Sequence, residues 1–99
     1  MSEKWKDELT DQLSSSLPRL STREEAYHYL EDLATIAEIK AMAQRLEVAK
    51  LLLQGYTYPK IVEETGASTA TISRIKKTVE YGVDGYKLVL DRLKDDAKK

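Results

Sequence analysis

The side chains best suited to bind another molecule lie together between residues 68 and 77. This stretch is rich in hydroxyl groups and carries three basic groups and no acid: Ser68, Thr69, Ala70, Thr71, Ser73, Arg74, Lys76 and Lys77. Short or hydroxyl side chains allow close approach to base edges and thymine methyl groups, and an Arg can contact guanine or phosphate with two hydrogen bonds. Lys76 and Lys77, with Lys60 from the preceding segment, are expected near phosphates. The chemistry that this stretch favours is recognition of duplex DNA.

Residue choice and net charge leave two interpretations of this stretch open. Ser and Thr are poor choices for the interior of a merely solvated helix, because their hydroxyls compete with backbone hydrogen bonds, and this favours DNA binding. The net charge of −1 argues the other way, and residues 1–34 hold eight acidic against four basic side chains. The alternative is a helical dimerisation or protein-interaction module without specific DNA recognition.

Start and stop signals indicate two short helices around these side chains. Thr57 can cap the first helix, in which Pro59 is tolerated near the start because the amides there lack partners. Gly66 ends that helix, and Ser68 can cap a second one that continues to about residue 81. Two helices joined by a short turn that contains Gly are typical of the helix-turn-helix.

The expected helix-turn-helix covers about residues 57–79, with residues 68–80 as the recognition helix in the major groove. The positions at which its two helices must pack on each other are all apolar: Ile61, Val62, Ala67, Ile72 and Ile75. We therefore predict a motif with an apolar inner face and a polar outer face.

Further amphipathic segments lie on both sides of this motif. Apolar side chains recur every four residues in the first segment, before a proline: Trp5, Leu9, Leu13 and Leu17. Ser21 or Thr22 can cap the next helix. Thr35 repeats the capping signal, so a third helix is expected to begin there and to continue to Gly55. A last helix is expected from Asp84, which gives an all-α fold of six helices without strands.

The composition argues against several other classes of protein. The chain has no Cys and a single His, which excludes disulfides, thiolate zinc sites and multi-histidine metal sites. No carboxylate pair, nucleophile with a base or phosphate-binding Gly loop stands out, so we expect no enzyme, catalytic residue, metal or cofactor. The 99 residues fit one domain, 1–99, with a core small enough that dimerisation would help. Without a signal peptide or an apolar run of membrane-spanning length, we expect a cytoplasmic protein with no membrane partner.

The segment Gly66–Arg74 resembles the tryptophan-repressor superfamily, and more closely its bacterial branch called YerC/YecD-like. The similarity extends to residues 43–52 and 81–93, and so covers nearly the whole chain. The resemblance implies a six-helix Trp-repressor-like fold in an intertwined homodimer, with double-stranded DNA as partner and transcriptional regulation as function. Two-fold symmetry would place the two recognition helices about 34 Å apart, which fits a palindromic operator.

The resemblance also implies where a small corepressor would bind. Tryptophan repressors hold the ligand ring between two Arg side chains, with a Thr and one Arg near its carboxylate; Thr35, Arg45 and Arg74 occupy these positions here. Thr78 falls near the position that contacts the ligand's amino group. The chain departs from the family at Ile75, where the repressors have a Gly that leaves room for the indole. We therefore expect no response to tryptophan, whereas another small effector stays open.

Overall fold

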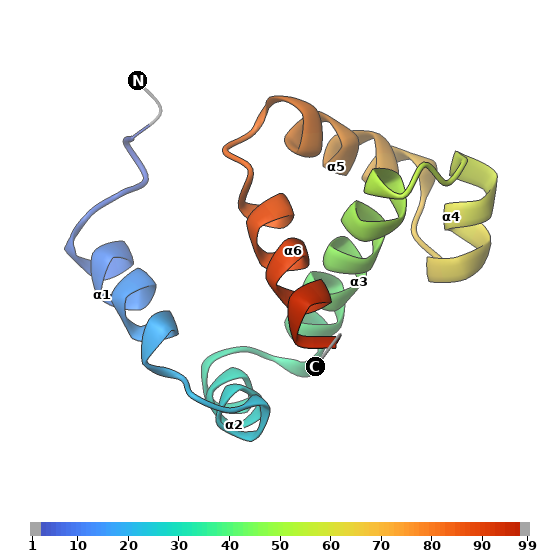
Figure 1. Cartoon of the computed structure of the whole chain (residues 1–99). Helices are drawn as coiled ribbons and strands as arrows, with labels where there is room; N and C mark the ends of the chain where they lie inside the picture. The colour runs from blue at the N-terminus through green and yellow to red at the C-terminus, as the bar shows by residue number, and fades with distance from the viewer. Residues whose placement is uncertain (1–2, 98–99) are drawn as a thin grey trace. The chain divides into compact units, whose positions relative to one another are not determined.

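The protein is an all-α chain in a computed structural model that describes residues 3–97 (Figure 1). These residues form six α-helices and one short 3-10 helix, η1, and no strand: α1 (Glu8–Ser16), η1 (Leu17–Arg19), α2 (Arg23–Leu33), α3 (Ile36–Leu53), α4 (Tyr58–Thr65), α5 (Thr69–Tyr81) and α6 (Gly85–Ala97). The predicted helix count and fold class are confirmed. The chain divides into two compact units, Met1–Ile36 and Ala37–Lys99, and the expectation of one domain over residues 1–99 stays a prediction.

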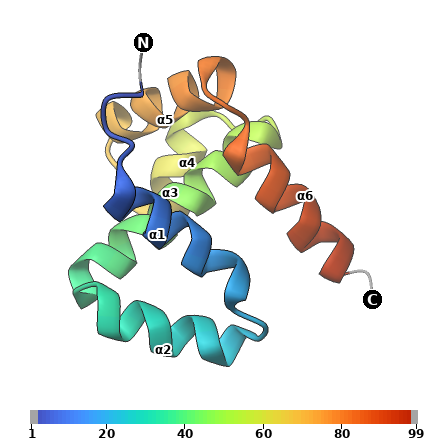
Figure 2. The ribbon, with the colours of Figure 1, turned by 90° about the vertical axis from the view of Figure 1, so that its left-hand side faces the viewer.

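The first unit consists of α1 and α2, which are joined through η1 (Figure 2). Asp7 begins α1 with a capping box, since its carboxylate accepts from the Thr10 amide at 2.9 Å and its own amide donates to the Thr10 hydroxyl at 2.7 Å. Trp5, which we expected in the apolar stripe of this helix, therefore precedes it. The Ser16 and Tyr29 hydroxyls are hydrogen bonded at 2.5 Å and connect α1 to α2.

The predicted start of α2 is confirmed in detail. The Glu25 amide donates to the Thr22 hydroxyl at 3.1 Å, and the Ser21 amide donates to the Glu25 carboxylate at 2.7 Å. Despite these well-formed ends, neither α1 nor α2 contains a buried residue. Leu9, for example, is 77% exposed although it belongs to the predicted apolar stripe.

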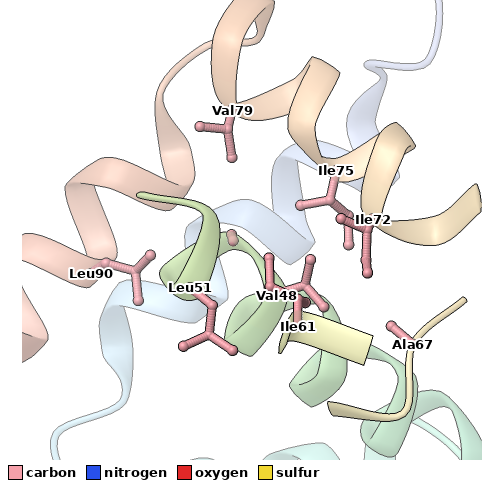
Figure 3. Close-up of a cluster of buried hydrophobic side chains, with 9 residues drawn as sticks. Val48, Leu51, Ile61, Ala67, Ile72, Ile75, Val79 and Leu90 are labelled. Carbon is pink, nitrogen blue, oxygen red and sulfur yellow. The ribbon is translucent and has the colours of Figure 1, made fainter. Parts of the chain in front are cut away.

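The second unit contains α3 to α6 around one apolar cluster (Figure 3). Helix α3 begins directly after Thr35 and ends before Gly55, whose φ of +85° is the left-handed conformation that favours glycine. The cluster draws on all four helices and on the turn between α4 and α5: Val48, Ala49, Leu51, Ile61, Ala67, Ile72, Ile75, Val79 and Leu90. Every apolar position that the sequence predicted between the two helices of the motif is buried or packs against this cluster.

The connection from α5 to α6 depends on a close backbone approach. The Gly82 amide donates to the Thr78 carbonyl at 2.8 Å, and a Cβ added at Gly82 would lie only 2.5 Å from that carbonyl oxygen. Asp84 follows with a positive φ of 64° and precedes the first residue of α6. The predicted start of the last helix at Asp84 is therefore confirmed.

Candidate nucleic-acid interface

The turn between α4 and α5 has the geometry of a helix-turn-helix. Thr57 begins α4 as its N-cap, and Gly66 ends it with a φ of +74° while its amide donates to the Val62 carbonyl at 2.8 Å. Ala67 is buried beneath the turn, and the Ser68 hydroxyl accepts from the Thr71 amide at 3.1 Å to begin α5. Each start and stop that the sequence predicted for this motif is confirmed.

Helix α5 has one fully apolar face and one polar face. Ile72, Ile75 and Val79 are buried in the apolar cluster that α5 shares with α3, α4 and α6 (Figure 3). The opposite side presents the recognition face, which we define as Ala70, Ser73, Arg74 and Lys77; all four residues are exposed. Their spacing of three and four residues puts them on one side of the helix. Thr71, an expected site residue outside this face, is half-buried. The other expected site residues outside this face are exposed: Lys60, Ser68, Thr69 and Lys76.

The hydroxyl groups of α5 fall into two classes. The Ser68 hydroxyl also donates to the Thr71 hydroxyl at 3.1 Å, so these two side chains are engaged in beginning the helix. The Thr69 and Ser73 hydroxyls make no hydrogen bond to residues 3–97. The helix cap thus accounts for part of the hydroxyl excess that the sequence associated with DNA, whereas Thr69 and Ser73 have no such structural use.

The four basic side chains differ in their neighbours. The Lys60 ammonium lies 3.3 Å from the Glu63 carboxylate and 3.5 Å from that of Glu64, so its charge is compensated on its own helix. Arg74 and Lys77 have no ion pair within the described part of the chain. Residues three and four apart on a helix are neighbours, so the spacing of Lys60 with Glu63 and Glu64 is the sequence signal for this compensation.

The expected effector positions come from different elements of the chain. Arg45 of α3 and Arg74 of α5 are both exposed. The Thr78 hydroxyl donates to the Arg74 carbonyl of its own helix at 3.4 Å. Thr35 precedes α3, in the other unit. Ile75, which we expected to fill the space for an indole, is 3% exposed and belongs to the apolar cluster.

Residues 3–97 contain neither a metal-binding cluster nor a membrane-spanning helix. No group of three or more His, Cys, Asp or Glu side chains in residues 3–97 is arranged to hold a metal ion. In the same part of the chain, no helix combines the length and the apolar character needed to cross a membrane.

Comparisons with known proteins agree on one family. The family model described as Trp repressor protein matches residues 8–94. The chain is 55% identical over 85 residues to the uncharacterised protein YerC of Bacillus subtilis, a match that covers 86% of this chain and 82% of YerC. A crystal structure of a candidate Trp repressor from Staphylococcus aureus superposes with a TM-score of 0.89 at 46% identity over 95% of both chains. A TrpR-like protein from Eubacterium eligens gives a TM-score of 0.87 at 47% identity, over 93% of this chain and 95% of that one.

Proposed function

This chain belongs to the Trp repressor protein family, and on that premise we propose that it is a transcriptional regulator that binds duplex DNA as a homodimer. Residues 68–80 of each protomer lie in the major groove of one half of a palindromic operator, as helix-turn-helix proteins bind. The observation that supports this most is the recognition face, which is polar, basic and exposed on a helix whose other face is buried. The compartment that we propose is the bacterial cytoplasm, which holds the genome.

The distribution of apolar side chains supports the homodimer. Helices α1 and α2 contain no buried residue, and large apolar side chains of α1 and α6 stay exposed: Leu9, Leu13, Leu88, Val89 and Leu93. Monomeric proteins rarely leave so much apolar helix surface exposed, and apolar surface of this kind is typical of interfaces. A second copy of the chain, offering the same apolar helices, would cover it.

Selection from random duplexes tests the proposed function. We expect the purified full-length protein to enrich a palindrome and to bind it with an affinity that falls steeply as salt rises, because lysines and arginines release counterions from phosphates. Fluorescence anisotropy of the labelled duplex at several salt concentrations measures both effects. Equal and weak binding to every duplex would contradict specific regulation.

The compensated charge of Lys60 favours a second candidate, a helical interaction module without specific DNA recognition. On that account α4 presents no net positive charge to a duplex, since Glu63 and Glu64 accompany Lys60. The same selection separates the two candidates. A dimer in solution that enriches no sequence would support the interaction module.

Removing the two acids of α4 should strengthen DNA binding. Glu63→Gln combined with Glu64→Gln frees the Lys60 ammonium and removes repulsion from phosphates, and we expect about fivefold tighter binding at low salt. Screening should shrink the gain as ionic strength increases. Anisotropy titrations at low and high salt measure it.

The matched control is Asp95→Asn combined with Asp96→Asn, an equal change of net charge on α6. An equal gain in the control would show that net charge, and not the pairs on α4, limits binding.

A further inference from the structure

Lys76 is the only lysine of the described motif that lies over an aromatic ring. Its ammonium is 5.9 Å from the centre of the Tyr58 ring, which comes from the other helix of the motif. Cations lying over aromatic faces at this separation are attracted by the electron-rich face of the ring. The contact therefore connects the first residue of α4 to the second half of α5.

The Tyr58 ring is held by its surroundings. Tyr58 is half-buried and packs against the apolar cluster, and it follows directly on Thr57, which caps α4. Pro59 next to it fixes the backbone further. A free Lys side chain has several rotatable bonds, and ordering it on binding costs conformational entropy. A ring in a fixed position restricts the Lys76 side chain before any partner arrives.

The ring leaves the charge of Lys76 available, unlike the neighbours of Lys60. Lys76 has no acidic side chain within ion-pair distance among residues 3–97, whereas Lys60 has two. One side of the ammonium faces the ring, and the hydrogens on its other side can be donated to an anion. Lys76 also follows Ile75 and lies one turn after Ile72, which puts it at the edge of the recognition face, next to the buried stripe.

We propose that Tyr58 is a positioning residue: it holds the Lys76 ammonium between the start of α4 and the second half of α5, so that Lys76 contacts a DNA phosphate beside the groove. This proposal rests on the proposed function, because the phosphate belongs to the duplex bound by α5. It makes Lys76, and not Lys60, the lysine that fixes the position of the motif on the backbone of the duplex. Side chains that contact phosphates set register and orientation, and those that contact bases set sequence preference.

A double-mutant cycle on the selected duplex tests the proposal in the full-length protein. Tyr58→Phe keeps the ring and should bind within about twofold of the parent, whereas Tyr58→Leu should bind about two- to fivefold more weakly. Lys76→Met should weaken binding to all duplexes and reduce the slope of log affinity against log salt by about 1 per protomer. In the Lys76→Met background, Tyr58→Leu should have no further effect.

The free protein provides a readout that does not depend on DNA. The ε-methylene protons of Lys76 should be shifted upfield by the ring in NMR spectra of the parent and of Tyr58→Phe, and not of Tyr58→Leu. Equal weakening by Tyr58→Leu with and without Lys76, or an unchanged salt slope in Lys76→Met, would overturn the positioning role. A parent protein that binds no duplex specifically would overturn the proposed function instead, even if the NMR shift is present.

Discussion

Replacing Arg74 by Ala is expected to weaken binding to the selected duplex by at least about thirtyfold. A bidentate contact between an Arg and a base contributes about 1–3 kcal/mol of discrimination, and a dimer makes the contact twice. Arg74 is exposed and has no ion pair within residues 3–97, so the fold does not depend on it. Anisotropy measures the loss of affinity, and circular dichroism should show an unchanged melting temperature.

Arg23→Ala is the matched control, since it removes the same type of exposed side chain from α2. It should leave the affinity within about twofold of the parent, as expected for a surface change away from the interface. Thr71 is not a suitable companion substitution, because its hydroxyl is bonded to Ser68 at the start of α5. Normal binding by Arg74→Ala would show that α5 does not use this side chain in the groove.

Replacing Ile75 by Ala is expected to lower the free energy of unfolding by about 2–4 kcal/mol. Ile75 is 3% exposed in the cluster that joins α3, α4 and α5, so the change removes buried methyl groups and leaves a cavity. Urea unfolding monitored by circular dichroism measures the loss. Val83→Ala, at a position that is 97% exposed, is the control and should change stability by no more than about 0.5 kcal/mol. A similar small effect at Ile75 would contradict its role in the core.

The side chain of Ile75 is also the basis of a proposal about tryptophan binding. Ile75 is packed in the cluster, and the resemblance puts it where tryptophan repressors have Gly, so we propose that tryptophan is not an effector of this protein. Titration calorimetry of the parent protein with tryptophan should give no binding heat. Micromolar binding would contradict the proposal and would mean that the indole is accommodated elsewhere.

Local signals account for the parts of the fold that were predicted correctly. Thr22, Thr57 and Ser68 each begin a helix where a capping side chain precedes an apolar stripe, and Gly66 ends α4 in the left-handed conformation. These features depend on a few neighbouring residues, so one sequence is enough to predict them. The resemblance to the tryptophan-repressor superfamily is confirmed by the match over residues 8–94.

The features that were missed depend on competition between neighbours or on tertiary contacts. Trp5 fits the apolar spacing of α1, but Asp7 caps the helix, which therefore begins after Trp5. The contact of Tyr58 with Lys76 joins two helices, and no spacing along the chain indicates which side chain will lie over which ring. An effector site would also depend on tertiary contacts, because Arg45 and Arg74 come from different helices.

Because α1 and α2 contain no buried residue, the stability of the protein is expected to depend on its concentration in the cell. If the apolar surface of these helices is covered only by a second copy, part of the stability of each chain comes from association and therefore varies with concentration. Dilution would then release the DNA and loosen the N-terminal helices in the same step. On the proposed function, a falling copy number would by itself end DNA binding.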